Sequence, residues 1–275
     1  MTAVPALTLN NGVRIPQLGF GTYQIPPEET RETTLVALET GYRHIDTAEM
    51  YGNEKGVGQA VRDCGIDRAD LFVTSKLDNH AHARDDALRA FDTTMRELGL
   101  DYLDLFLIHW PLPGRGDFVE TWKALEEIYR SGRVKAIGVS NFQPHHLRRL
   151  SQGSDVVPAV NQIEVHPYLT QDDVRAFGTE RGIATEAWSP IARGKVLDDP
   201  AVERVARAAG RTPAQVVLRW HLQRGDIVFP KSATRKRIEQ NFDVFDFALD
   251  EGAMGQISAL NRDERTGPDP DRFTG

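Results

Sequence analysis

The sequence predicts an α/β fold, a (β/α)8 TIM barrel with an N-terminal β-hairpin and two extra helices. Short apolar runs typical of buried parallel strands occur eight times along the 275 residues. They start 24 to 43 residues apart, and helical patterns occupy the intervals. Neither a linker nor a low-complexity stretch interrupts the alternation. We therefore expect residues 1–275 to form one barrel domain.

The expected elements follow the chain in a regular order. A hairpin comes first, because the segments 7–10 and 13–16 flank Asn11-Gly12, a strong turn signal. The eight strands are expected at residues 18–22, 44–48, 71–76, 103–109, 134–140, 159–165, 183–189 and 226–230. Helices between them are expected to end on glycines that suit a C-cap, namely Gly41, Gly65, Gly99, Gly132 and Gly182.

The last part of the chain holds more helical patterns than a plain repeat needs. Segments 199–210 and 212–225 both precede the last strand, and segments 234–245 and 250–261 follow it. One of the first two is an insertion, so we expect two extra helices. The tail, residues 262–275, is rich in Pro, Gly and Asp and is expected to be a loop.

Composition excludes several classes of partner. The formal net charge is −7, and nothing in the sequence builds a broad basic face, so no nucleic-acid partner is expected. The single cysteine, Cys64, allows no intrachain disulfide and suits a reducing compartment. We see no signal peptide and no run of membrane-spanning length. A cytoplasmic protein without a membrane partner is expected. We also expect a monomer, because no long apolar stripe demands a partner.

Histidines give little indication of a metal site. His80 and His82 lie two residues apart in a polar segment, and no third ligand has convincing spacing. His145 and His146 begin a helix after Pro144 and are expected to be exposed. No metal is therefore predicted.

Four polar side chains fall at or just past the ends of three successive predicted strands: Asp46, Tyr51, Lys76 and His109. The C-terminal ends of barrel strands share one mouth, so we expect these side chains to meet there. Each has a plain structural explanation if taken singly, such as a capped turn for Asp46 or a solvated position for Lys76. Taken together they explain one another, because a buried carboxylate and a buried ammonium each need a partner.

This group is suited to delivering a proton to a carbonyl that is being reduced. A free phenol has a pKa of about 10, and a neighbouring cation favours the phenolate. Lys76 would thus make Tyr51 a better acid near neutral pH, with Asp46 holding the lysine. His109 could donate a hydrogen bond that orients the carbonyl oxygen.

Further polar groups at the same mouth could bind a cofactor. Amide and hydroxyl groups at Ser140, Asn141 and Gln162 could grip a carboxamide, and Trp188 offers either a stacking face or a core side chain. After the last strand, a basic cluster enters a helix and could form an anion site, although such a run is often only a solvated face. This cluster comprises Lys231, Ser232, Thr234 and Arg237. Residues 19–24 resemble a glycine-rich nucleotide motif only weakly, so a Rossmann domain is not supported.

The chain resembles the aldo-keto reductases over nearly its whole length. The stretches that carry the resemblance are LGFGTYQ, GYRHIDTAEMYGNEKGVGQAV, LFVTSKL, DYLDLFLIHWP, GRVKAIGVSNF, NQIEVHPYL, EAWSPIARG and VFPKSATRKRIEQNFDVFDF. Within this family it is most similar to the small bacterial branch that includes 2,5-diketo-D-gluconate reductases. The resemblance implies a (β/α)8 barrel that binds an extended nicotinamide cofactor without a Rossmann fold.

The resemblance also implies roles for individual residues. Tyr51 would be the proton donor, Lys76 and Asp46 would tune it, and His109 would position the carbonyl. Residues implied in cofactor binding, with NADPH favoured over NADH, are Gly21, Thr22, Ser140, Asn141, Gln162, Trp188, Ser189, Ala192, Gly194, Lys231, Ser232, Thr234, Arg237, Glu239 and Asn241. The substrate, a small carbonyl compound, would contact His109, Trp110 and Asp78.

Two features set this chain apart from many relatives. Asp78 stands where an aromatic residue often follows the lysine, so we expect weaker handling of bulky aromatic aldehydes and acidic substrates unless another loop shields it. The C-terminal tail is short, so we expect an open, permissive site.

Two alternatives to a reductase remain at this point. A Schiff-base lyase could use Lys76 as the nucleophile. A non-catalytic barrel could instead sense NADP(H) or serve a structural purpose, because fold alone does not settle function.

Overall fold

The computed structural model describes residues 4–116 and 118–275. Eight parallel strands form a barrel in the order β10-β9-β8-β7-β6-β5-β4-β3, and β1 and β2 form a separate antiparallel hairpin. The strands are β1 (Ala6–Thr8), β2 (Arg14–Pro16), β3 (Phe20–Gly21), β4 (His44–Asp46), β5 (Phe72–Leu77), β6 (Leu103–Ile108), β7 (Val134–Ser140), β8 (Val160–Glu164), β9 (Ala184–Trp188) and β10 (Ile227–Val228).

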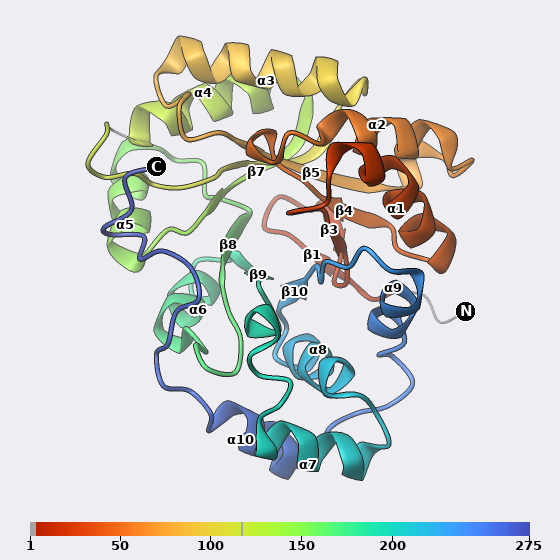
Figure 1. Ribbon diagram of the computed structural model, residues 1–275. Helices are drawn as coiled ribbons and strands as arrows, with labels where there is room; N and C mark the ends of the chain where they lie inside the picture. Colours follow the sequence, from red (N-terminus) through yellow and green to blue (C-terminus); the bar gives the residue numbers. More distant parts are fainter. Residues whose placement is uncertain (1–3, 117) are drawn as a thin grey trace.

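Helices surround the barrel, as Figure 1 shows. They are α1 (Pro27–Thr40), α2 (Glu54–Asp63), α3 (Arg84–Leu98), α4 (Phe118–Arg130), α5 (Pro144–Gly153), α6 (Asp172–Thr179), α7 (Pro200–Ala209), α8 (Pro213–Gln223), α9 (Arg235–Phe242) and α10 (Glu251–Ser258). Short 3-10 helices are η1 (Glu49–Tyr51), η2 (Arg68–Asp70) and η3 (Ala192–Gly194). Helices α7 and α10 pack together beside the repeat, which confirms the two predicted extra helices.

The barrel closes between its first and last strands. The Gly19 amide donates to the Val228 carbonyl at 2.7 Å, and the Val228 amide donates to the Gln17 carbonyl at 3.0 Å. Both terminal strands are shorter than the sequence predicts, because the ladder continues here as single bonds and an isolated bridge between Leu18 and Val228. The predicted (β/α)8 fold is confirmed.

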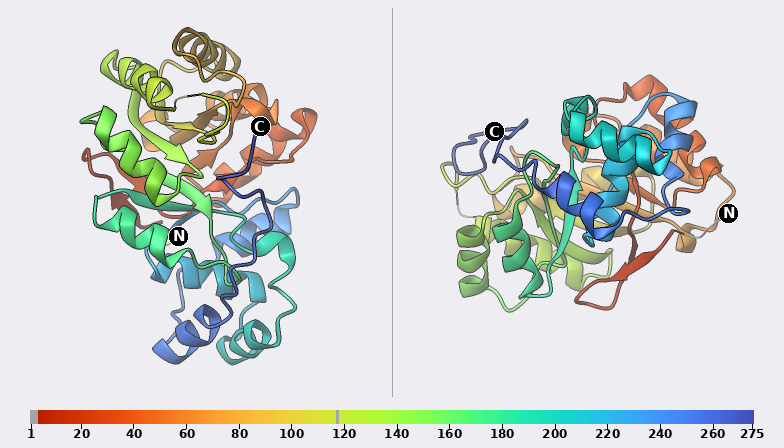
Figure 2. Two further views of the ribbon diagram at one scale, coloured as in Figure 1. Left: turned by 90° about the vertical axis from the view of Figure 1, so that its left-hand side faces the viewer. Right: turned by 90° about the horizontal axis from the view of Figure 1, so that it is seen from below.

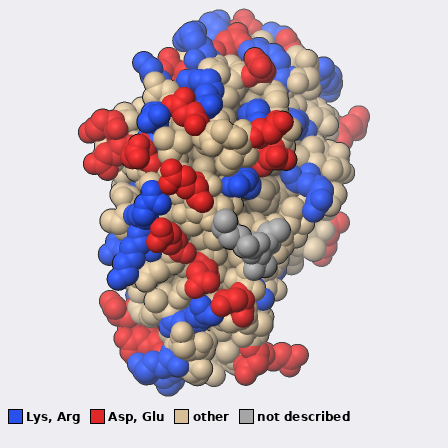
Figure 3. Space-filling model, turned by 90° about the vertical axis from the view of Figure 1, so that its right-hand side faces the viewer, with Lys and Arg blue, Asp and Glu red and all other residues tan. Residues whose placement is uncertain are grey.

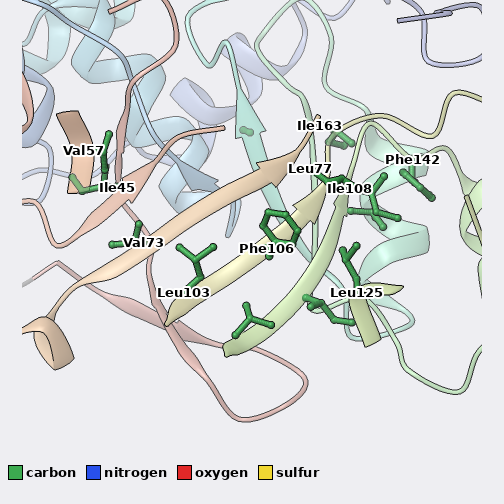
Figure 4. Packing of buried hydrophobic residues seen from close by; sticks show 14 of the residues in the cluster. Ile45, Val57, Val73, Leu77, Leu103, Phe106, Ile108, Leu125, Phe142 and Ile163 are labelled. Carbon is green, nitrogen blue, oxygen red and sulfur yellow. The ribbon is translucent and has the colours of Figure 1, made fainter. Parts of the chain in front are cut away.

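The strands alternate between two apolar layers, because successive side chains of a strand face opposite sides. Outward residues such as Ile45, Val73 and Phe106 form the large core beneath the helices (Figure 4). A second cluster includes inward residues of the barrel, among them Leu105 and Val160. A strand whose two faces are both buried in apolar layers therefore has an almost continuous apolar sequence.

The hairpin lies at the end of the barrel where the parallel strands begin. Its residues Leu9 and Ile15 belong to the same cluster as Phe72 at the start of β5. The Asn11 side chain donates to the Lys135 carbonyl at 3.0 Å, which ties the turn to β7. The right-hand view of Figure 2 shows the red hairpin and the end of the blue tail on different sides of the barrel. The hairpin therefore covers the end of the barrel at which the strands begin.

One glycine allows the barrel interior to pack closely. A Cβ atom on Gly138 would lie 2.6 Å from the Val160 carbonyl oxygen and 2.7 Å from a methyl group of Leu107. Both distances are too short for carbon atoms, so a side chain at this point of β7 would push neighbouring strands apart.

Surface charge is mixed on the face shown in Figure 3, where Lys and Arg alternate with Asp and Glu. Among the described residues, no helix combines the length and apolarity that crossing a membrane requires.

Candidate active site

Lys76 is the centre of the site and comes from the end of β5. Its side chain is fully buried, and its Nζ donates to Asp46 Oδ1 at 2.7 Å and to the Thr47 carbonyl at 2.8 Å. The Tyr51 hydroxyl oxygen lies 3.4 Å from the same nitrogen. The ring of His109 lies next to Tyr51, with 5.9 Å between the ring centroids. The fold thus brings together the four side chains that the sequence singled out.

The loop after β4 is fixed so that Tyr51 faces this lysine. Tyr51 ends η1, and Gly52 follows with φ of 66°, a left-handed conformation that a glycine adopts easily. The buried Asn53 amide donates to the Thr22 carbonyl at 2.9 Å, and its oxygen accepts from Thr47 Oγ1 at 3.0 Å. These bonds connect the loop to β3 and β4, and they hold the phenol in place.

Charge pairing stabilises the buried lysine in its protonated form. Burial lowers the pKa of Lys76, but the neighbouring Asp46 carboxylate and Tyr51 together raise it above its usual value. Burial raises the pKa of Asp46 above its usual value, although Lys76 and the Gln162 amide act in the opposite direction. Because removing either partner would leave a buried charge unpaired, we regard the two residues as one unit.

The pKa values of Tyr51 and His109 decide which group can donate a proton. Burial raises the pKa of Tyr51 to about 12, although Lys76 pulls it down. The predicted effect of the cation is therefore present, because Lys76 lowers the pKa of Tyr51, but burial raises that pKa by more. Burial, and secondarily Lys76, lowers the pKa of His109 well below its usual value. At neutral pH the phenol holds its proton, and the imidazole is neutral.

Gln162 on β8 uses its side-chain amide nitrogen for contacts within the protein and leaves its amide oxygen for a ligand. Its Nε2 donates to Asp46 Oδ2 at 2.9 Å and to Glu186 Oε2 at 2.7 Å. No hydrogen bond within the described ranges reaches its Oε1 from another residue. That oxygen can accept from a carboxamide, as the sequence-based role requires.

Asn141 connects the two sides of the mouth and has φ of 65°. Its Nδ2 donates to the His109 carbonyl at 3.0 Å and to Ser140 Oγ at 3.1 Å, and its Oδ1 accepts from Trp188 Nε1 at 2.8 Å. These bonds hold the Trp188 ring across the mouth. Through these bonds Asn141 positions its neighbours, while direct contact with a carboxamide stays a prediction.

The predicted anion cluster lies where the chain enters α9. Thr234 precedes the helix, and its side chain does not cap it. The side chains of Lys231 and Arg237 are exposed, and neither has an ion-pair partner within residues 4–116 and 118–275. Ser232 is buried, and its Oγ accepts from the Thr234 amide at 3.2 Å. Unpaired cations beside free helix amides can bind a phosphate group.

The remaining predicted cofactor residues lie around the same side of the mouth. Thr22 is buried and donates through Oγ1 to the Asp46 carbonyl at 3.0 Å. A Cβ on Gly21 would lie 2.6 Å from the Phe229 carbonyl oxygen, so only glycine fits there. Ser189 and Ala192 both have φ of 49°, a strained conformation for residues with a side chain. Gly194 ends η3 in the same loop, whereas Glu239 and Asn241 lie on α9.

The substrate side of the mouth has an apolar rim. Tyr23 and Met50 are 48% and 42% exposed, and the rings of Tyr23 and Tyr51 are 5.0 Å apart. Trp110 is buried next to Trp188, with ring centroids 6.5 Å apart. Sequence reasoning missed Tyr23 and Met50, although both are large apolar residues in loops that follow barrel strands.

Asp78 lies beside His80 in the loop that follows β5. Its Oδ2 lies 3.1 Å from His80 Nδ1, and its backbone amide donates to Glu49 Oε2 at 3.2 Å. His80 belongs to the same loop as Asp78, so no second loop is seen to shield the carboxylate, and the expected effect on substrates stays a prediction.

The short tail covers part of the mouth, contrary to the expected open site. The Thr266 amide donates to Glu164 Oε1 at 2.6 Å, and the Gly267 amide donates to Glu164 Oε2 at 3.2 Å. Phe273 packs on Trp110, with ring centroids 4.4 Å apart. Figure 1 shows the blue tail passing α6 and ending near α5. Backbone bonds to one buried carboxylate explain why a short segment suffices.

His145, His146 and Asp271 form the group nearest to a metal-ligand set, with ligand atoms within 4.8 Å of one another. Nε2 of His145 and Nε2 of His146 lie 3.2 and 3.5 Å from Asp271 Oδ1. However, His146 Nδ1 accepts from the Gln143 amide, which leaves the proton on Nε2. Both imidazoles thus face the Asp271 carboxylate of the tail, but His146 Nε2 forms no hydrogen bond with any described residue. His146 is buried, so its predicted exposure is wrong, because the tail and Phe118 cover it.

Glu186 is the main residue of the site that sequence reasoning missed. It lies on β9 two positions before Trp188, and its side chain is fully buried. A carboxylate inside the apolar run ATEAW was a usable signal, equal in kind to Asp46 in HIDTA. Alternation along the strand places it on the same side as Trp188.

Comparisons with known proteins agree with this geometry. The sequence profile described as "Aldo/keto reductase family" matches residues 17–262. An "Aldo-keto reductase" of Mycobacterium sp. (strain KMS) is 50% identical over 269 residues, covering 98% of both chains. "Methylglyoxal reductase DkgA" of Escherichia coli (strain K12) is 46% identical, again with 98% of both chains covered.

A solved structure extends the similarity to the fold. The crystal structure of a Gox0644 variant in complex with NADPH has a TM-score of 0.95 and 46% identity, with 99% of both chains covered. Family profile, relatives and structure therefore give one answer: this chain belongs to the aldo/keto reductase family, and it is an oxidoreductase.

Proposed function

We propose that the protein reduces aldehydes and ketones to alcohols with NADPH, and that Tyr51 donates the proton. The substrates in view are dicarbonyls, keto-sugars and keto acids. The observation that carries the proposal is the position of Lys76 Nζ, which touches Asp46 Oδ1 at 2.7 Å and the Tyr51 hydroxyl at 3.4 Å. A protonated phenol beside a fixed cation gives up its proton with the resulting phenolate already stabilised.

The residues of the mouth fit NADPH. Lys231 and Arg237 are exposed and have no ion-pair partner among the described residues, so they suit a phosphate on the adenosine ribose. The side-chain oxygen of Gln162, which no described residue contacts by a hydrogen bond, suits a carboxamide. Trp188 offers its ring for stacking, and the glycine-rich turn at Gly21 allows close approach of a ligand to the backbone. When bound, NADPH supplies the hydride that reduces the carbonyl carbon.

Each catalytic side chain has one task in this proposal. His109, being neutral, donates a hydrogen bond to the carbonyl oxygen and holds it beside the phenol. The Tyr51 O–H bond breaks as a new O–H bond forms on the substrate. Lys76 keeps its own proton and stabilises the phenolate, while Asp46 holds the ammonium in place. Relatives named "Glyoxal reductase" and "Methylglyoxal reductase DkgA" support small dicarbonyls as the first substrates to test.

The contacts of Lys76 argue against a Schiff-base lyase. An amine nucleophile must be neutral and reachable, but Nζ is buried, its pKa is raised, and its three acceptors are Asp46, Thr47 and Tyr51. Borohydride treatment in the presence of a carbonyl compound would trap an adduct on Lys76 if the lyase reading were correct.

The test is NADPH oxidation by the purified protein against dicarbonyls, keto-sugars and simple aldehydes. Tyr51→Phe should lose roughly 10²- to 10⁴-fold in turnover while it binds NADPH as before, since only the phenolic hydroxyl that donates the proton is removed. Near-full activity in that variant would refute the assignment of the proton donor. Tight NADPH binding by the native protein without turnover of any carbonyl would favour the cofactor-sensing alternative.

We also propose that the protein is a cytoplasmic monomer that acts on small molecules. The single thiol, Cys64, supports a reducing compartment, and no disulfide is needed to hold the barrel. Sedimentation at several concentrations would test the monomer, because a dimer would change its apparent mass with dilution.

A further inference from the structure

A second carboxyl group lies beneath the catalytic unit and has no part in the proposed mechanism. Glu186 Oε2 accepts from Gln162 Nε2 at 2.7 Å, and the same nitrogen donates to Asp46 Oδ2 at 2.9 Å. Asp46 Oδ1 in turn accepts from Lys76 Nζ at 2.7 Å. One amide group therefore holds two buried carboxyls, and a continuous chain of hydrogen bonds links Glu186 to the catalytic lysine.

Only one of these carboxyls can be neutralised by a cation. Lys76 contacts Asp46, whereas Glu186 Oε1 has no hydrogen-bond partner in the described part of the chain. His44 Nε2 lies 4.0 Å from this oxygen, but burial lowers the pKa of that imidazole to about 3, so it is not a cation at neutral pH. On β10, the residue in register with Glu186 is the apolar Ile227.

Glu186 therefore holds a proton at neutral pH. Burial, and next the charge of Asp46, raises the pKa of Glu186 to about 8, while Gln162 and Lys76 act the other way. The proton belongs on Oε1, because Oε2 already accepts from the amide. In this state the buried unit contains one carboxylate and one ammonium.

We propose that Glu186 is a positioning residue that must stay protonated for fast carbonyl reduction, because its ionisation places a second negative charge against the Asp46–Lys76–Tyr51 unit. This inference rests on the proposed function. The negative charge of ionised Glu186 would offset part of the stabilisation that Lys76 gives to the Tyr51 phenolate. Tyr51 would therefore release its proton less readily. It would also draw the Gln162 amide away from Asp46.

The chain offers a matched control in Glu54 on α2. This carboxyl is also buried, and burial raises its pKa to about 7, but it is held by Ser75 and Thr94 outside the network. Glu186→Gln and Glu54→Gln thus each remove one buried carboxyl group with a raised pKa, the first inside the hydrogen-bond network and the second outside it. Glu186→Leu, which also removes the acceptor for Gln162, separates the loss of charge from the loss of the hydrogen bond.

The first readout is single-turnover oxidation of bound NADPH by methylglyoxal between pH 6 and pH 10. In the native protein the rate should fall roughly fivefold across a transition near pH 8. Glu186→Gln and Glu186→Leu should lack this transition, and Glu54→Gln should keep it. A transition that persists in Glu186→Gln, or disappears in Glu54→Gln, would overturn the proposal.

The second readout needs no turnover. With ¹³C-labelled tyrosine, the Tyr51 ring resonance should titrate about half a pH unit to one unit lower in Glu186→Gln than in the native protein, because a negative charge has been removed. Equal midpoints in the two proteins would refute the coupling. If the native protein reduces no carbonyl, the proposed function fails, and this titration still decides whether Glu186 acts on Tyr51.

Discussion

The catalytic centre and the start of α9 differ in how complete they are before any ligand binds. At the centre, Lys76 is fully buried, and its ammonium contacts Asp46, Thr47 and Tyr51. At the start of α9, Lys231 and Arg237 are exposed, and no described residue forms an ion pair with them. Folding thus pairs the charge at the catalytic centre, whereas the cations at the start of α9 are left for an anionic ligand to pair with.

Desolvation explains this difference. A charge inside the barrel must find its partner during folding, since an unpaired buried ion is strongly destabilising. An exposed cation is solvated by water, so leaving it without an anionic partner costs little folding free energy. Substitutions should therefore affect both stability and turnover at the centre, and only binding at the start of α9.

The largest effect should come from Lys76→Met. This change leaves Asp46 buried without its cation and should lower the free energy of unfolding by roughly 3 kcal/mol, with turnover reduced at least ~10³-fold. Urea unfolding and NADPH oxidation would measure the two effects.

The double variant Lys76→Met with Asp46→Asn sharpens this test. It removes both charges, so it should regain most of the lost stability but none of the lost turnover. Equal instability in the single and double variants would show that the two residues do not act as a pair.

A pH effect on stability should follow from Glu186. Its pKa is raised from 4.5 in the unfolded chain to about 8 in the folded protein, so the folded state retains a proton that the unfolded state loses. This contribution is complete below pH 4.5 and disappears as the pH rises toward 8.

Between pH 5 and pH 8 the native protein should thus lose roughly 3 kcal/mol relative to Glu186→Gln. Urea unfolding of both proteins at each pH measures this. Glu54→Gln should remove a smaller part, since burial raises the pKa of Glu54 only to about 7. A constant difference between native protein and Glu186→Gln would contradict the protonated state.

At the start of α9 the expected effect is on binding alone. Arg237→Ala should weaken NADPH binding by roughly 10- to 100-fold and leave NADH binding nearly unchanged, because only the former carries the extra phosphate. Stability should change by no more than about 0.5 kcal/mol. Arg235→Ala is the matched control, since that arginine already pairs with Glu39 at 2.9 Å. Equal losses for both cofactors would place the phosphate elsewhere.

The smallest effect should come from Asp78, which His80 accompanies. Asp78→Asn should raise kcat/KM for carboxylate-bearing carbonyls by only about two- to threefold and leave neutral aldehydes unchanged. His80→Ala, which exposes the carboxylate, should act in the opposite direction. A gain above tenfold for acidic substrates in Asp78→Asn would show that the charge faces the substrate directly.

The sequence by itself determined the barrel and the members of the catalytic centre. Apolar runs such as LDLFLIH can be buried on both faces only in a parallel sheet covered by helices, and Asp46 and Lys76 stand out because charges are rare in such runs. Their place at strand ends directed them to one mouth, which the fold confirms.

Tertiary structure alone decided the protonation states and the partners. The raised pKa of Tyr51 depends on burial by distant segments, and the pairing of Glu186 with Gln162 and Asp46 joins residues up to 140 positions apart. The tail's cover of Trp110 likewise follows from backbone bonds to Glu164. Desolvation and hydrogen bonding depend on what surrounds a group in space, and the order of residues along one strand does not specify that.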